Sequence, residues 1–246
     1  MIVVIGLPAY AGSADGEGSA GGLAVDAAAA AAVRGSSVEL VGKVGDDGAG
    51  DAVVLALSRL GVGHAALLRD PARSTPVLSA VPVALGSEAA DGAGGALAGD
   101  DLTADALVAG APAGERGDEA PQVEVELLPT DPAARPGLEA GDISLALRYL
   151  AETRVVVLAE PLPEAAVAAV VEGATFAGAR LVVLLPPGAT PPALPPDATL
   201  LEAPAVDDGS FGRVVGAFAA GLDAGTEPAA AFAEAVRASG WEPVAD

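Results

Sequence analysis

The sequence predicts an α/β protein with a mostly parallel, doubly wound sheet. Short apolar runs are typical of strands buried on both faces, and the segments 2–8, 154–160 and 180–188 contain such runs. Segments with helical spacing or a high alanine content lie between them. This alternation favours parallel strands joined by right-handed crossovers. We therefore expect helices on both faces of one central sheet.

The first 70 residues predict two strand and helix units. Residues 2–8, IVVIGLP, predict a buried strand that glycine and proline end. The alanine-rich segment 23–35 predicts a helix that stops at Gly35. The second unit comprises a strand over 38–41, a glycine and aspartate turn over 45–48, and a helix that begins at Asp51 and ends at Gly61.

The middle of the chain differs from these units. Residues 75–85 are strand-forming, and residues 122–128 alternate apolar and acidic residues, which indicates a half-exposed strand. Between them, the segment 86–120 is acidic and rich in glycine and alanine, with no period and little to bury. It predicts a long, partly disordered loop.

The second half returns to strand and helix alternation. The predicted elements are a helix over 141–153, strands over 154–160 and 180–188 with a helix over 163–179 between them, a strand over 198–204, and helices within 207–225 and 227–241. The proline-rich segment 186–197 follows a strand at the sheet edge where open α/β sheets bind ligands, although a plain connecting loop explains it equally well.

Composition excludes several classes of function. A formal net charge of −22 repels phosphate backbones and anionic lipids, so we expect neither nucleic acid nor a membrane surface as partner. The absence of cysteine and the single histidine exclude thiolate chemistry and make a histidine metal site or a serine triad improbable. The sequence contains neither an apolar run of about 18 residues nor a basic, signal-like start, and therefore predicts a cytoplasmic protein.

Three segments resemble one family. Residues 21–62 contain a glycine pair, an alanine-rich helix and VGKVGDDGAG; residues 155–187 contain a strand, an EPLP turn, a helix and a strand; and residues 207–222 read DDGSFGRVVGAFAAGL. This order resembles the ribokinase-like (PfkB) carbohydrate kinases. The resemblance implies one ribokinase-like domain over 1–246, an αβα sandwich with a small β-sheet lid.

The resemblance also implies where the lid and the site lie. Strands near 8–20, 75–85 and 122–128 would form the lid, which in the family closes over a sugar and often forms a dimer interface. Gly21, Gly22 and Asp26 would bind the ligand. Gly209, Ser210 and Gly212 would form the turn that holds the transferring phosphate, a role that suits a helix N-terminus.

The sequence departs from the family where the chemistry would occur. Aligned without a gap, the catalytic aspartate position is Gly212, and Phe211 replaces a glycine of the phosphate turn. The family's sugar-binding aspartate after the first strand is Ala11 here. Asp207 and Asp208 either cap the last motif's helix or replace the missing base, and both would repel a triphosphate. The segment between residues 202 and 207 is also too short for the family's nucleotide-binding elements, so the domain is truncated before the second signature.

These departures favour a degenerate family member, a binding or scaffold protein without phosphotransferase activity. It would bind a sugar-like small molecule, form a homodimer through its lid, and need no metal or cofactor. The alternative is a divergent carbohydrate or nucleoside kinase that uses Asp207 or Asp208 as base with ATP and Mg²⁺. A third possibility is an interaction module without a small-molecule pocket. The sequence names neither the ligand nor the partner.

Overall fold

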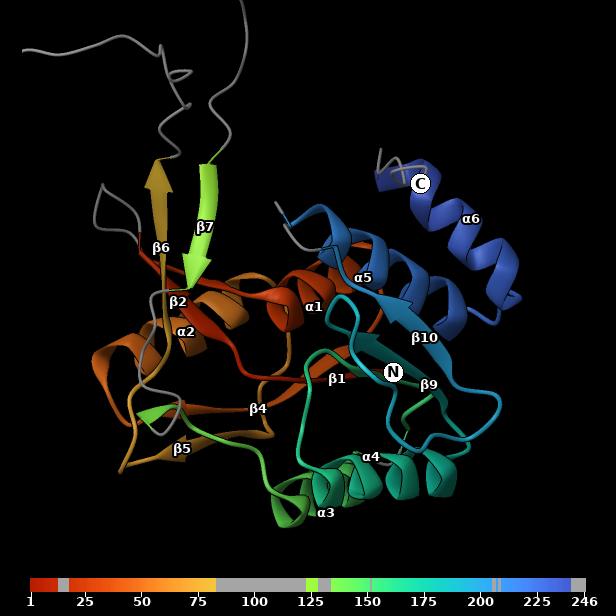
Figure 1. Cartoon of the computed structure of the whole chain (residues 1–246), viewed down its shortest axis with the longest axis horizontal. Coiled ribbons are helices and arrows are strands. Elements are labelled where there is room, and N and C mark those ends of the chain that lie inside the picture. Colours follow the sequence, from red (N-terminus) through yellow and green to blue (C-terminus); the bar gives the residue numbers. More distant parts are fainter. Residues whose placement is uncertain are drawn as a thin grey trace, which may run out of the picture.

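The main sheet is six-stranded, and every strand pair in it is parallel (Figure 1). The computed structural model of the chain describes residues 1–12, 18–82, 123–127, 134–150, 152–204, 207 and 209–239. The strand order is β10-β9-β8-β1-β4-β5. In chain order the strands are β1 (Ile2–Ile5), β4 (Val38–Gly45), β5 (Leu67–Asp70), β8 (Val155–Leu158), β9 (Arg180–Leu185) and β10 (Thr199–Glu202).

Helices cover both faces of this sheet, which confirms the predicted fold class (Figure 1). The helices α1 (Leu23–Val33), α5 (Ser210–Asp223) and α6 (Pro228–Ser239) lie on one face, and α3 (Ala140–Tyr149) and α4 (Glu164–Ala177) on the other. The helix α2 (Gly48–Arg59) packs beside β4 and a second, smaller sheet. No helix in the described part of the chain is long and apolar enough to cross a bilayer.

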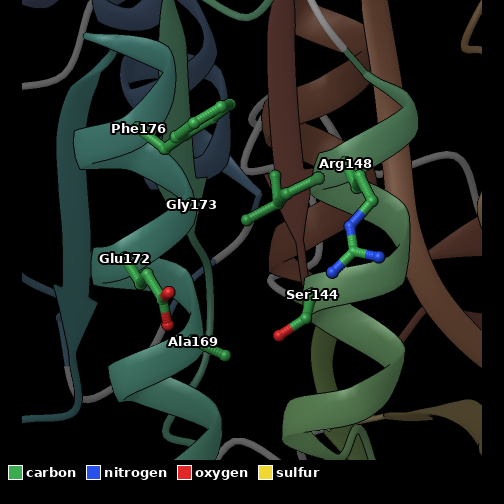
Figure 2. A pocket seen from close by; sticks show the side chains of 7 residues that line it. Ser144, Arg148, Ala169, Glu172, Gly173 and Phe176 are labelled. Carbon is green, nitrogen blue, oxygen red and sulfur yellow. The ribbon is translucent and has the colours of Figure 1, made fainter.

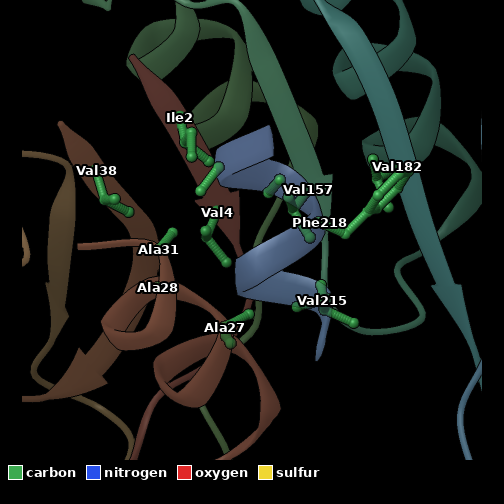
Figure 3. Close-up of a cluster of buried hydrophobic side chains, with 14 of the residues drawn as sticks. Ile2, Val4, Ala27, Ala28, Ala31, Val38, Val157, Val182, Val215 and Phe218 are labelled. Carbon is green, nitrogen blue, oxygen red and sulfur yellow. The ribbon is translucent and has the colours of Figure 1, made fainter. Parts of the chain in front are cut away.

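The strand β1 shows why both faces need a helical cover. Its residues are all buried, and alternate side chains enter two separate cores. Ile2 and Val4 pack with the alanines of α1 and with Phe218 of α5, as Figure 3 shows, whereas Val3 and Ile5 pack against α3 and α4. The few aromatic residues include Phe218 and Phe232, whose rings meet edge to face at 5.7 Å. Most of the remaining core consists of alanine, valine, leucine and isoleucine side chains, and the alanines of α1 let that helix approach the sheet and α5 closely.

The smaller sheet has four strands in the order β3-β2-β6-β7 (Figure 1). They are β2 (Ala9–Ala11), β3 (Ser19–Gly21), β6 (Val77–Pro82) and β7 (Val123–Leu127). The pairs β2–β3 and β6–β7 are antiparallel, and the pair β2–β6 is parallel. β6 and β7 lie within the segments 75–85 and 122–128, and β2 and β3 lie at or beside the segment 8–20, from which lid strands were expected. The side chains of β7 and the segment 86–120 lie outside the described residues.

Two helix boundaries differ by three residues or more from the sequence-based expectation: α3 ends at Tyr149, not at residue 153, and α2 starts earlier than expected. The helix α2 begins at Gly48, not at Asp51, because Asp47 acts as its N-cap. The Asp47 side chain accepts hydrogen bonds from the Gly50 amide at 2.8 Å and from the Thr75 hydroxyl and amide at 2.7 and 2.9 Å. Burial opposes ionisation, but these hydrogen bonds prevail and hold the pKa of Asp47 below its usual value. The acidic turn thus joins α2 to the residue that leads into β6.

Candidate functional site

The glycine pair connects the small sheet to α1. Gly21 ends β3, and a side chain there would meet the Leu78 side chain of β6 at 2.8 Å. Gly22 has a φ of 97°, which side-chain-bearing residues rarely adopt, and its carbonyl accepts hydrogen bonds from the amides of Val25 and Asp26. Both glycines are therefore required locally, and they place Asp26 in the first turn of α1.

The first turn of α5 lies against this turn of α1. Gly209 is the N-cap of α5, in a left-handed conformation with a φ of 83°. A Cβ on Gly209 would lie 3.6 Å from an Asp26 carboxylate oxygen and 3.5 Å from the Arg213 guanidinium. The structure thus brings the predicted ligand-binding residue Asp26 beside the predicted phosphate turn.

Gly212, at the expected position of the catalytic aspartate, faces α1 directly. A Cβ on Gly212 would lie 2.5 Å from the Cβ of Asp26, closer than two carbon atoms can approach. One turn later, a Cβ on Gly216 would lie 2.2 Å from the Ala27 carbonyl oxygen. Glycine at both positions is thus a condition for the close contact between α1 and α5.

The Asp207 side chain binds a backbone amide of α5. Its Oδ1 accepts a hydrogen bond from the Phe211 amide at 3.0 Å, so this carboxylate caps the helix. This is the capping contact considered for Asp207. Asp208 lies outside the described residues. The phenyl ring of Phe211 is buried in the core on this face.

Asp26 lies in an unusual electrostatic environment. Burial and then the negative charge of Asp207 raise the pKa of Asp26 to about 6, while Arg213 opposes the rise. Asp26 and Gly209 also line a cavity of about 450 Å³ together with Arg213 and Arg34, whose other walls include the small side chains of Ala29 and Ala30. This cavity holds one acid with a pKa near neutrality and two guanidinium groups. Such a set can donate and accept hydrogen bonds to a small polar ligand.

A second buried acid, Glu160, was not predicted as a functional residue. It follows β8 at the carboxyl edge of the main sheet, between β8 and β1, where the strand order reverses. Open α/β sheets bind ligands at such a point. Burial raises the pKa of Glu160 to about 7, although a hydrogen bond from the Leu7 amide and the charge of Arg135 oppose this. Glu160 Oε1 and Arg135 Nε are buried without a hydrogen-bond partner among the described residues.

The sequence contained a signal for Glu160. An acid directly after a buried parallel strand and before two prolines occupies the edge that carries ligands. The loop after β1 lies against this carboxylate: the Leu7 amide donates a hydrogen bond to it, and a Cβ on Gly6 would lie 3.9 Å from Glu160 Oε1.

Lys43, the only lysine in the sequence, has a structural contact. Its ammonium group lies 2.6 Å from Asp142 Oδ2 and is largely buried. The same Asp142 oxygen accepts a hydrogen bond from the Glu139 amide and completes the capping box of α3. Lys43 thus links β4 to α3. Within the described residues, no cluster of three or more histidine, aspartate or glutamate side chains could hold a metal ion.

Comparison with known proteins identifies the architecture. No protein-family model matches the sequence, and neither does any curated protein. Among solved structures, Sa239 aligns with a TM-score of 0.63 and 13% identity, over 99% of this chain and 95% of that one. Ribokinase from Arabidopsis thaliana, solved with ribose and ATP, aligns with a TM-score of 0.59 and 13% identity, over 97% of this chain and 90% of that one.

This chain has a ribokinase-like fold. The family resemblance found in the sequence is therefore confirmed at the level of the fold, and at this identity the likeness extends no further. In the ribokinase-like fold of this chain, the carboxyl edge of the main sheet carries the small sheet, the first turns of α1 and α5, and Glu160. The candidate site is this edge.

Proposed function

We propose that the protein binds a small, sugar-like polyhydroxylated molecule at the candidate site and does not transfer a phosphoryl group. The proposal rests on the contacts that the first turn of α5 already makes within the protein. Asp207 accepts the Phe211 amide hydrogen bond there, and Gly212 packs against Asp26 without room for a side chain.

The physical argument concerns what phosphoryl transfer needs. A helix N-terminus binds a transferring phosphate through free backbone amides and its positive dipole end. A carboxylate that already caps this turn competes for the same amides and repels the phosphates. Positioning and charge stabilisation supply most of the catalysis in phosphoryl transfer, so their loss is more serious than the loss of one base.

The same residues suit hydroxyl groups. With a pKa near 6, Asp26 exchanges between acid and carboxylate at neutral pH, so it can both donate to and accept from a hydroxyl. Arg213, near the start of α5, adds donors that do not lose their charge. Glu160, at the sheet edge, has an oxygen without a partner among the described residues. We propose that the ligand satisfies such groups without any metal or cofactor.

Thermal unfolding in the presence of pentoses, hexoses, polyols and nucleosides tests the binding proposal, because a ligand that binds only the folded state raises the melting temperature. We expect a concentration-dependent rise with at least one polyol. Asp26→Asn should weaken that binding about tenfold or more, as expected for a hydrogen bond to a charged group. The control is Asp197→Asn, an exposed acid outside the site, which should bind normally. No response to any member of the panel would contradict the proposal and favour the interaction module.

One observation favours a second candidate function, a carbohydrate or nucleoside kinase that uses ATP and Mg²⁺. The Cβ of Asp26 lies 2.5 Å from the place where the Cβ of residue 212 would be, so the Asp26 side chain starts almost where the family's catalytic carboxylate would start. In this alternative Asp26, not Asp207 or Asp208, accepts the proton of the substrate hydroxyl.

An assay of ADP release over the same panel separates the two functions. If the protein only binds its ligand, the wild type should release no substrate-dependent ADP. If it is a kinase, it should show turnover that Asp26→Asn reduces by about 10²-fold or more, the usual contribution of a general base. Turnover that survives in Asp26→Asn but disappears in Asp207→Asn would instead support Asp207 as base.

A further inference from the structure

The outer face of α3 and α4 contains a groove between the two helices. The groove holds about 320 Å³, and Ser144, Leu147 and Arg148 of α3 and Glu172, Gly173 and Phe176 of α4 line it. Figure 2 shows that the two helices run in the same direction, with Ser144 and Ala169 at one end and Arg148 and Phe176 at the other. Gly173 forms the contact between the helices, because a Cβ there would lie 2.3 Å from Leu147 Cδ1.

Large apolar side chains are exposed around this groove. Phe176 is 93% exposed and Tyr149 is 79% exposed, and Leu145 is also exposed one turn before Tyr149. The whole chain has only seven aromatic residues. Two of them are thus placed in water at the C-terminal ends of two neighbouring helices, which is unfavourable unless another surface covers them.

The charges on the two walls are opposite. Arg148 stands on α3 and Glu172 on α4, at similar heights along the groove (Figure 2). Within the part of the chain that the structure describes, neither forms an ion pair. In a protein of net charge −22, most surfaces would repel a second copy. At the groove itself, one basic and one acidic side chain stand on opposite walls.

We propose that the α3/α4 face binds a second copy of this chain about a two-fold axis that runs along the groove. Such an axis lays α3 of one copy over α4 of the other, and a two-fold interface repeats every contact. Arg148 then meets Glu172 of the partner subunit twice. Phe176 comes to lie over Tyr149 of the partner subunit, also twice, and the small residues Ser144 and Ala169 allow close approach at the other end.

This arrangement explains why opposite charges stand on the two walls of the groove. A self-complementary patch needs each charge matched by its opposite across the axis, and the two walls provide that match. A partner of uniform charge would leave one of the two charges unpaired, which costs binding energy. The second copy is therefore the occupant that the charges favour.

Sedimentation velocity of the full chain over a concentration series tests the proposal. We expect reversible dimers at micromolar concentration. Arg148→Glu alone and Glu172→Arg alone should each weaken dimerisation about tenfold, because two attractive pairs become repulsive. The double variant, which exchanges the charges, should restore it. Phe176→Ala should weaken dimerisation at least tenfold, whereas Val33→Ala, an exposed apolar residue on α1, should not change it.

The charge-exchanged variant keeps the test independent of folding defects, because a misfolded single variant would not be rescued by a second reversal. A monomer at all concentrations would overturn the proposal. So would a dimer that the single reversals leave intact, which would place the interface elsewhere, for example at the edge of the small sheet, or a double variant that stays monomeric.

Discussion

The substitution Gly216→Ala tests the close contact between α1 and α5. A Cβ at this position would lie 2.2 Å from the Ala27 carbonyl oxygen and 2.7 Å from the Ala30 Cβ. Ordinary contacts between such atoms are about 3.5–4.0 Å, so the two helices must separate by about 1 Å or more. The obstacle includes backbone, which cannot rotate away. Overpacking of this kind typically costs about 1–3 kcal/mol, and we expect Gly216→Ala at or above the upper end.

The intrinsic effect of the substitution has the opposite sign. Alanine in place of glycine within a helix stabilises by about 0.5–1 kcal/mol when nothing obstructs it. Gly141, in the first turn of α3, has nothing within 4 Å of its ideal Cβ. Gly141→Ala is therefore the matched control, and it should be neutral or stabilising.

Urea unfolding followed by circular dichroism measures both variants, with the slope on denaturant compared to verify that the same surface is exposed. The expected difference between the two variants is about 2–4 kcal/mol in the free energy of unfolding. If Gly216→Ala were as stable as Gly141→Ala, the helices would not be in contact as described. The explanation given for glycine at position 212 would then be lost as well.

Three other outcomes are expected. Gly212→Asp should not create ADP-releasing activity and should destabilise the fold, because its Cβ would lie 2.5 Å from that of Asp26; substrate-dependent turnover in this variant would contradict the packing argument. For Glu160, burial raises the pKa in the folded state from 4.5 to about 7. Below pH 4.5 the carboxyl is neutral in both states and the fold keeps its full stability; as the pH rises to 7, ionisation in the unfolded state lowers the stability of the fold. Glu160→Gln should therefore match the wild type near pH 4 and be more stable at pH 8 by up to about 3 kcal/mol, and equal stability at both pH values would refute the raised pKa. Finally, a net charge of −22 predicts a melting temperature that rises from low to moderate salt, and a flat or falling curve would show that charge repulsion is minor.

The buried strands were predictable because a strand covered on both faces consists of consecutive apolar residues, which can be read directly from the sequence. β1 and β8 are apolar throughout, and both faces of each are covered by helices. The start of α2 was misplaced although the capping bond from the Gly50 amide to Asp47 is local; the bonds from Thr75, which also hold the Asp47 carboxylate, come from 28 residues away. The glycine and aspartate turn at residues 45–48 was recognisable, but the sequence did not show which backbone amides would donate hydrogen bonds to Asp47.

The candidate site was predicted in part for a related reason. Asp26 and Gly209 could be named from the motifs, because each is local to a helix start. That glycine at position 212 is a packing requirement could not be read from the sequence, since the obstacle is a side chain on α1. The raised pKa of Glu160 likewise depends on the burial created by several segments.

The contact between Lys43 and Asp142 has a consequence for chemical labelling. Lys43 carries the only ε-amino group in the sequence, and its side chain is only 14% exposed and paired at 2.6 Å. An amine acylates readily only when a reagent can reach it, and here the amine is largely buried and paired with a carboxylate. Acylation of this group therefore requires β4 and α3 to separate, so its rate follows the local opening of the structure between those two elements. Peptide mapping, which separates acylated Lys43 from an acylated α-amino group on Met1, would report that opening at a single lysine.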